Sequence, residues 1–540
     1  MKKLIVLIGA FTGLCNLSYG YGYDFSAVYQ GKTIHYGITS NTEPYTVEVT
    51  CKRKADNKEY IMYPSYEGEV SIPSEVVYAD KTYLVTAIGE YAFQVCTKLT
   101  SISIPNSVKT IGKAAFFVCK GLISISIPNS VTTIGSNAFS YCTNLISVII
   151  PMSVTDIGSI AFSDCSNLTS VTILNPDICM GSSVFKDCNN LTSITFPDSI
   201  TKIKSNMFSG YKGLKSITIP NSVTTIETAA FSGCTGLTAI TIPNSVTTIE
   251  QNAFYGCTGL TAITIPKSVT WIRENAFYGC TGLTAINIPN SITTIEQNAF
   301  YGCTGLIAIT IPNSVIIINE KTFSKCTGLT TVTIPKSVVV IEHWAFWGCT
   351  GLTAVTIPKS VITIGSMAFS ECTGLTAITI PNSVTTIETA AFSGCTGLTA
   401  ITIPKSVTTI ETTAFYGCTG LTAITIPKSV KIIKENAFGG CTGLTAITIP
   451  KSVTSIGNSV FSGCSNLQEL YLYSIHPPVI EEGKLYNVSK NHITLYVPRK
   501  AIPLYRATAG WNEFPIKAIP CSKKKSKNNS QQKNDQDYDD

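Results

Sequence analysis

The sequence has little charge for its length. Charged residues make up 13% of the 540 residues, and the formal net charge is only +6. That share is about half of what soluble domains usually carry. Nucleic-acid binders and membrane-surface binders need concentrated basic patches, so this charge balance indicates neither class, and we expect no nucleic-acid partner. Hydrophobic residues make up 44%, which is ample material for a core.

Residues for catalysis and metal binding are also scarce. The sequence has 4 histidines, and they lie in three separate regions: His35, His343, His476 and His492. None pairs with another at metal-ligand spacing or sits in a motif with a nucleophile. The sequence has no C-x₂-C pair, which zinc sites require. We therefore predict a protein that is not an enzyme and that uses no cofactor or metal.

No apolar run after the N-terminal region is long enough to cross a membrane. The first 20 residues resemble a secretory signal, with Lys2 and Lys3 before an apolar stretch and small residues near Gly20. A membrane anchor is the alternative, but the apolar run is too short. A lipid-attached Cys15 is a second alternative, but a lipoprotein signal needs a small residue at the position of Leu14. We predict cleavage after about Gly20 and a secreted or cell-surface mature chain without an integral membrane segment.

One period organises most of the chain. Phenylalanine recurs every 23 residues, 17 times, from Phe93 to Phe461. Leucine follows six residues after each phenylalanine, and a cysteine lies between them in every unit except one, where Tyr211 replaces it. A fixed period of this size is typical of a solenoid, because each unit is too small to bury its own apolar face and must stack on its neighbours.

The unit Leu237 to Gly259 shows what each position does. Residues 239–242 alternate and are rich in β-branched side chains, which predicts a strand that ends at Pro243. Residues 246–249 predict a second short extended segment. Residues 250–255 predict one helical or 3₁₀ turn that carries Phe254 into the core. Equivalent residues of successive coils then stack about 4.8 Å apart.

The cysteine column has two interpretations. Disulfides between adjacent coils are not excluded by the coil spacing alone. The other interpretation is a column of small buried thiols, because cysteine packs as a small hydrophobe. The single replacement by Tyr211 favours thiols, since a paired framework should lose cysteines two at a time.

The repeat resembles a known family. The strand half, L-x-x-I-x-I-P, is similar to a leucine-rich repeat. The variant segments S-V-T-T-I at 222–226 and A-F-S-G-C at 230–234 resemble the BspA-like leucine-rich repeat family over about residues 70–475. The resemblance implies a surface or secreted protein of the kind found in bacteria and some protist parasites, several of which resemble adhesins for host proteins. The family offers no catalytic or binding residue to carry over.

We therefore predict a β-rich solenoid, a right-handed leucine-rich-repeat array of about 17 coils with N- and C-terminal caps. The expected division is a signal peptide at 1–20, a β-rich N-terminal cap at 21–92, the solenoid at 93–472, a C-terminal cap at 473–520 and a disordered polar tail at 521–540. The sequence gives no indication of the oligomeric state.

Positions where the coils differ outwardly are the best candidates for a site. The residue after each repeated phenylalanine is most often serine, but five units carry tyrosine or tryptophan there. Aromatic residues are favoured at recognition sites. The alternative is that they only pack coil against coil. A lysine column, which runs from Lys267 to Lys451, has two interpretations as well: a solvated face or an electrostatic strip. The predicted binding residues are Tyr255, Trp271, Tyr278, Tyr301, Trp344 and Trp347.

Three functions are compatible with the sequence. The first is an exported binding protein that attaches to a host or extracellular matrix protein through the solenoid surface. The second is a structural surface array or stalk without a specific ligand. The third is a carbohydrate-acting enzyme whose site lies unrecognised in a cap.

Overall fold

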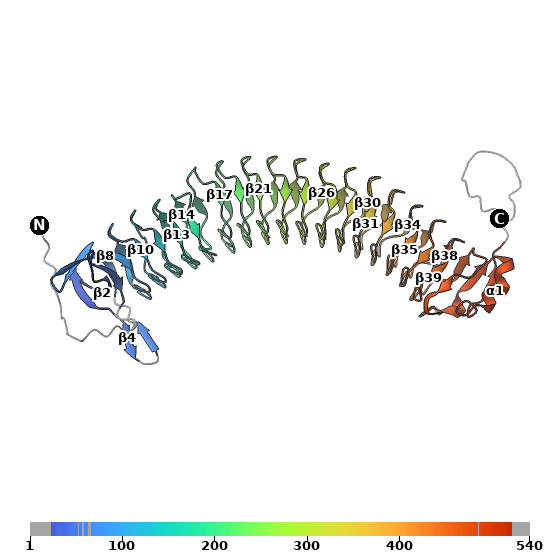
Figure 1. Ribbon diagram of the computed structural model, residues 1–540, viewed down its shortest axis with the longest axis horizontal. Coiled ribbons are helices and arrows are strands. Elements are labelled where there is room, and N and C mark those ends of the chain that lie inside the picture. Colours follow the sequence, from blue (N-terminus) through green and yellow to red (C-terminus); the bar gives the residue numbers. More distant parts are fainter. Residues whose placement is uncertain (1–22, 52, 57–58, 63–65, 484, 521–540) are drawn as a thin grey trace.

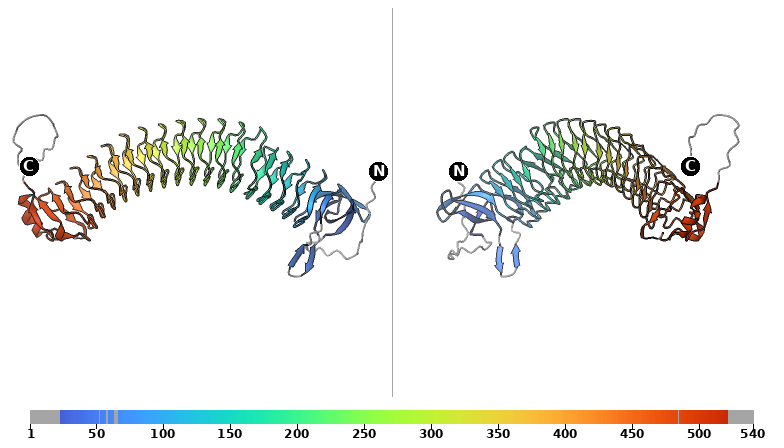
Figure 2. Two further views of the ribbon diagram at one scale, coloured as in Figure 1. Left: turned by 180° about the vertical axis from the view of Figure 1, so that it is seen from behind. Right: turned by 45° about the vertical axis from the view of Figure 1, so that its right-hand side comes forward.

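The computed structural model describes residues 23–51, 53–56, 59–62, 66–483 and 485–520. The chain forms one curved stack of coils, which follows an arc with a β-rich unit at each end (Figure 1). The same arc is seen in both rotated views (Figure 2). The predicted signal peptide and the predicted polar tail lie outside the described residues.

The coils contribute strands of two to five residues to two faces, and the coil that carries β11 (Thr133–Ile134) contributes to the second face alone. The first, which we call the long-strand face, consists of β9 (Leu99–Ser103), β12 (Ser147–Ile150), β14 (Ser170–Ile173), β16 (Ser193–Thr195), β18 (Ser216–Thr218), β20 (Ala239–Thr241), β22 (Ala262–Thr264), β24 (Ala285–Asn287), β26 (Ala308–Thr310), β28 (Thr331–Thr333), β30 (Ala354–Thr356), β32 (Ala377–Thr379), β34 (Ala400–Thr402), β36 (Ala423–Thr425), β38 (Ala446–Ile449) and β40 (Glu469–Leu472).

The second, which we call the short-strand face, consists of β10 (Thr110–Ile111), β11 (Thr133–Ile134), β13 (Asp156–Ile157), β15 (Cys179–Met180), β17 (Lys202–Ile203), β19 (Thr225–Ile226), β21 (Thr248–Ile249), β23 (Trp271–Ile272), β25 (Thr294–Ile295), β27 (Ile317–Ile318), β29 (Val340–Ile341), β31 (Thr363–Ile364), β33 (Thr386–Ile387), β35 (Thr409–Ile410), β37 (Ile432–Ile433), β39 (Ser455–Ile456) and β41 (Val479–Ile480).

Paired strands are parallel, and their register places equivalent residues of successive coils side by side. Ile217 of β18 lies opposite Ile240 of β20, and Thr225 of β19 lies opposite Thr248 of β21. Because this step equals the sequence period, each position of the repeat becomes a column along the stack. Side chains alternate along a strand, so β20 buries Ile240 and exposes the residues on either side of it.

The third side of the coil, which we call the turn face, is not the helical or 3₁₀ turn that the sequence predicts. In the coil 237–259 it consists of overlapping β-turns, with hydrogen bonds from the Tyr255 N–H to the Asn252 carbonyl and from the Cys257 N–H to the Phe254 carbonyl. Asn252 and Gly256 have φ of 58° and 66°. Type II turns need a positive φ at their third residue, which asparagine and glycine accept, and this interrupts any helix.

The core is a set of columns inside the stack. Phe277 is fully buried and lies 5.4 Å, centroid to centroid, from both Phe254 and Phe300, with nearly parallel rings. The turn face adds backbone bonds between coils, such as the one from the Phe254 N–H to the Ala276 carbonyl. The predicted inward phenylalanine column is therefore confirmed.

The ladder cysteines of the described coils are free, buried thiols. From Cys119 onward, each ladder cysteine donates a hydrogen bond to the coil before it, as in the 3.1 Å hydrogen bond that the Cys280 Sγ donates to the Phe254 carbonyl. Burial raises the pKa of Cys257 and of Cys326 to about 12, so both thiols stay protonated and able to donate. Tyr211, the one exception, is also buried, and its hydroxyl donates to the Leu191 carbonyl.

The N-terminal unit continues the stack. Strands β1 (Phe25–Tyr29), β2 (Lys32–Ser40) and β3 (Thr46–Thr50) form an antiparallel sheet, and β3 pairs in parallel with β8 (Lys81–Ile88), which pairs in parallel with β10. β6 (Gly68–Ser71) pairs with β9, and β7 (Glu75–Tyr78) forms a hairpin with β8. The remaining elements of this unit are β4 (Arg53–Asp56) and β5 (Glu59–Met62). The first coil is therefore β6 and β8, interrupted by a hairpin, and β1–β3 cover its end.

The C-terminal unit adds one more coil and a cover. β40 pairs with β42 (Thr494–Val497), which pairs with the last strand, β43 (Ile516–Ala518). The helix α1 (Ile502–Ala507) and the short 3₁₀ turns η1 (Glu481–Gly483), η2 (Lys490–His492) and η3 (Arg499–Ala501) complete it. Trp511 is fully buried and donates its indole N–H to the Pro478 carbonyl at 2.8 Å. With one coil added at each end, the array has about 19 turns, slightly more than the 17 phenylalanine repeats.

Within the described part of the chain, no helix has the length and apolar character needed to cross a membrane.

Candidate binding surface

Three of the predicted aromatic residues form a stack on the turn face. Tyr255 and Tyr278 have ring centroids 4.8 Å apart, and Tyr278 and Tyr301 have centroids 4.7 Å apart, all nearly parallel. Burial between the neighbouring rings and the charges of the two other tyrosines raise the pKa of Tyr278. The rings cover one another's faces, so their edges and hydroxyls point outward and Tyr255 is 40% exposed. We call these three residues the tyrosine stack.

The sequence around each tyrosine explains this placement. Gly256, Gly279 and Gly302 follow the three tyrosines with φ between 66° and 69°, which closes a type II turn. An aromatic ring at this position leans toward the next coil. Tyr416, in the same column, shows this directly, because a Cβ added at Gly439 would lie 2.9 Å from its ring. The predicted packing between coils is therefore observed, and the same side chains also keep an exposed edge.

Trp344 and Trp347 lie farther along the turn face, beside two lysines. The Lys321 Nζ lies 4.6 Å from the Trp344 ring centroid, and the Lys325 Nζ lies 3.9 Å from the Trp347 ring centroid. Cations at this distance from an indole face are attracted to it. Trp347 occupies the same column as the tyrosine stack, but the coil between them carries the buried Ser324 there. The stack and the tryptophan pair are therefore neighbouring patches.

Trp271 belongs to a different face. It is the outward residue of β23 on the short-strand face, is 43% exposed, and is covered on one side by the Arg273 guanidinium at 4.3 Å from the ring centroid. Arg273 in turn pairs with Glu296 at 3.1 Å, so both groups are held in place. The structure thus distributes the six predicted residues over two faces.

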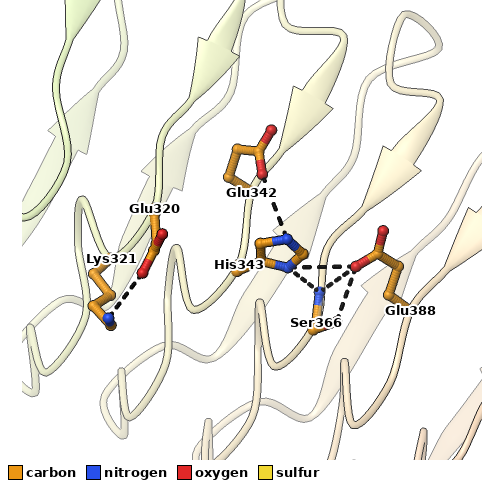
Figure 3. A network of polar contacts seen from close by, with 6 residues as sticks. All are labelled: Glu320, Lys321, Glu342, His343, Ser366 and Glu388. Carbon is orange, nitrogen blue, oxygen red and sulfur yellow. Dashed lines mark hydrogen bonds and ion pairs between the residues drawn. The ribbon is translucent and has the colours of Figure 1, made fainter.

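A polar network joins His343, Ser366 and Glu388 of three successive coils (Figure 3). The Ser366 N–H donates to both the His343 Nδ1 and a Glu388 carboxylate oxygen, each at 3.0 Å, and the Ser366 hydroxyl donates to the same oxygen at 2.9 Å. Because the serine hydroxyl donates to a carboxylate and not to the imidazole, this arrangement does not activate it as a nucleophile. We assign the network to positioning the corner of the coils.

Sequence reasoning missed an apolar patch on the short-strand face. Three successive coils carry Ile316, Val339 and Ile362 at the position that is threonine in most others, and Ile316 is 57% exposed. Their backbones are linked by hydrogen bonds of 2.8 and 2.9 Å, so they form a continuous row. Ile317 and Val340, which pair with each other, widen it. These five residues, which we call the apolar patch, could have been found by comparing exposed positions between copies of the repeat.

No group of three or more histidine, cysteine, aspartate or glutamate side chains within the described ranges has an arrangement that could hold a metal ion.

Comparison with known proteins identifies the repeat. Residues 86–502 are covered by overlapping matches, at 86–215, 201–327, 293–422 and 385–502, to the family described as BspA type leucine rich repeat region. The chain belongs to the BspA-type leucine-rich repeat family. Among solved structures, this BspA-type chain is similar to a leucine-rich repeat protein from Bacteroides ovatus, with 33% identity over 78% of this chain and 94% of that one and a TM-score of 0.53.

Two further solved structures match this BspA-type chain at lower identity. A leucine rich cell surface protein from Faecalibacterium prausnitzii is 24% identical over 84% of this chain and 96% of that one, with a TM-score of 0.32. The pneumococcal vaccine antigen PcpA is 18% identical over 92% of this chain and all of that one, with a TM-score of 0.27. The comparison with curated proteins gives no match.

Proposed function

We propose that the protein is an exported, non-enzymatic binding protein that attaches to host or extracellular matrix proteins through the middle of its solenoid. The observation that carries the proposal is the tyrosine stack, whose exposed edges stand at a position where serine is the commonest residue in the other coils. Aromatic anchors dominate the energy of many protein interfaces, and losing one costs about 2 kcal/mol or more.

The surroundings of the stack favour a protein ligand over a sugar. Stacking with neighbours occupies both faces of Tyr278, so no free ring face remains there for a sugar ring to cover. The edges and hydroxyls that remain suit the mixed apolar and hydrogen-bonding character of protein interfaces. The tryptophan–lysine pairs on the turn face and the apolar patch on the short-strand face lie in the coils that follow the stack, and both would add contact area for a large partner.

Export rests on the N-terminal sequence and on membership of the family, whose resemblance implies surface or secreted proteins. Lys2 and Lys3, the short apolar stretch after them and Gly20 are the features of a cleaved signal.

The test is a binding screen of the full mature chain against a panel of purified extracellular matrix proteins, followed by two variants. The first changes Tyr255, Tyr278 and Tyr301 to serine, the residue that other coils contain. The matched control is Tyr416→Ser, which alters the same position in the same column outside the middle coils and is 47% exposed.

We expect the triple variant to fold and to lose capture at least thirtyfold, which corresponds to about 2 kcal/mol, while Tyr416→Ser binds as the parent does. If the folded triple variant binds unchanged, the stack is not the site. If the parent captures no matrix protein, the alternative of a structural surface array gains support, and a glycan-degradation assay then tests the enzyme alternative.

A further inference from the structure

The C-terminal half of the solenoid carries a row of lysines at a position where the earlier coils have a single lysine, Lys267. Five of six consecutive coils have an exposed lysine directly after the proline that follows the long strand: Lys336, Lys359, Lys405, Lys428 and Lys451. The remaining coil has Asn382 at this position. At about 4.8 Å per coil, the row spans roughly 24 Å. We call these five residues the lysine column.

The fold does not require lysine here. Earlier coils carry asparagine at the same position, for example Asn221, Asn244 and Asn290, and their backbones follow the same path. Within the ranges that the structure describes, no ion pair joins Lys336, Lys359, Lys405 or Lys451 to a carboxylate. Like charges held at this spacing repel one another, so the column is a surface that a polyanion would neutralise.

The face beside the column is uncharged and hollowed. The outward side chains of β28 to β38 are alanine and threonine. A trough of about 920 Å³ runs over β32 and β34, and its lining includes Thr379 and Thr402, the isoleucines of both strands, and Lys359 and Lys405. Threonine hydroxyls and lysine ammonium groups that line one trough are the chemistry that binds a chain of sugars with acidic substituents.

We propose that this trough and the lysine column bind a linear anionic polysaccharide, whose repeated carboxylate or sulfate groups lie along the lysines. The trough residues include no aromatic side chain on which a nucleic-acid base could stack, and its cations are lysines without arginine. Single-stranded nucleic acids are usually held by stacking on aromatic rings, so a polysaccharide fits this surface better. The site is separate from the tyrosine stack and does not rest on the proposed attachment to proteins.

The test uses the full mature chain and four probes: heparin, which carries sulfates, hyaluronan, which carries only carboxylates, neutral dextran, and single-stranded DNA of matched length. The test variant changes Lys405, Lys428 and Lys451 to asparagine, which the fold already accepts at this position. The matched control changes Lys186, Lys212 and Lys215 to asparagine and removes the same charge from exposed positions in other coils. Equal thermal unfolding midpoints verify that all proteins are folded.

We expect the parent to bind heparin, or both heparin and hyaluronan, with affinity that falls as salt rises, and to ignore dextran. Binding of hyaluronan means that carboxylates suffice, and binding of heparin alone assigns the site to sulfates. Each ionic contact contributes about 0.7 to the slope of log affinity against log salt concentration. The column variant removes three lysines and should therefore lower this slope by about 2, while the control variant keeps the slope of the parent.

A further variant, Asn382→Lys, completes the column and should steepen the slope by about 0.7. The proposal is overturned if neither acidic polysaccharide binds, or if the control variant loses as much binding as the column variant, because net charge would then explain the effect. Tighter, column-dependent binding of the DNA would also overturn it and make nucleic acid the ligand.

Discussion

Removing one ring from the phenylalanine column should open the solenoid locally at a large energetic cost. Phe277 is fully buried and stacks on Phe254 and Phe300 at 5.4 Å on each side. Burial of such a side chain is worth about 1.5–3 kcal/mol, and each aromatic contact adds about 0.5–1.5 kcal/mol. Phe277→Ala also leaves a cavity between two rings that the strand ladders hold apart. We therefore expect a loss of about 3–5 kcal/mol.

The assay must resolve single coils, because stacked repeats open locally and not only as a whole. Hydrogen exchange at the Phe254 N–H, which bonds to the Ala276 carbonyl, reports on the junction directly. The expected loss corresponds to exchange faster by about 10²- to 4 × 10³-fold. Phe277→Leu, which keeps apolar contact but removes the ring, should cost only about 1–2 kcal/mol.

The neighbouring substitution Tyr278→Ser is the control for position. The Tyr278 ring lies on the turn face, so hydrogen exchange at the Phe254 N–H should change far less in Tyr278→Ser than in Phe277→Ala. A change below about tenfold in Phe277→Ala, or equal effects in the two variants, would refute the stacking argument.

Three further predictions follow from the same columns. Alkylation of the denatured, unreduced protein should count as many thiols as after reduction, and a rise on reduction would mean that disulfides are present. Burial raises the pKa of Cys257 and of Cys326 from 9.0 to about 12, so the unfolded chain loses these protons at a lower pH than the folded one. The free energy of unfolding should therefore be constant below about pH 9 and fall toward pH 12, by up to about 4 kcal/mol per thiol. A urea midpoint that does not fall between about pH 9 and pH 12 would contradict this prediction. Ile160 has a φ of 51°, which β-branched residues avoid, so Ile160→Asn should stabilise the protein by about 1 kcal/mol in urea unfolding, and a loss would show that the side chain's packing matters more.

The repeat fold follows from the sequence because its determinants are local and recur. The strand at 239–242, its end at Pro243 and the inward Phe254 were each predicted from one unit, and the parallel register needs only the period of 23. The prediction of a helical or 3₁₀ turn was wrong because Asn252 and Gly256 adopt positive φ. The recurrence of asparagine and glycine at these two positions was the signal that favoured β-turns.

The surface was only partly predictable. Sequence comparison between copies found the aromatic residues, but it could not place Trp271 on a different face from Tyr278, because that depends on where each segment of the coil turns. The apolar patch was missed because isoleucine in a β-rich repeat is usually assigned to the core, whereas Ile316 stands at an outward position. β3 pairs with β8, but β3 is not part of the repeat. The period of the sequence therefore could not indicate this pairing.

The central claim, that the middle coils bind a protein, is tested most directly by hydroxyl-radical footprinting. The full mature chain is footprinted alone and with the matrix protein that it captures most tightly. The account predicts that Tyr255, Tyr278 and Tyr301 lose reactivity in the complex, together with Ile316 of the apolar patch, while Tyr416 stays reactive. Protection confined to the terminal units or to the lysine column, with the tyrosine stack unchanged, would contradict it.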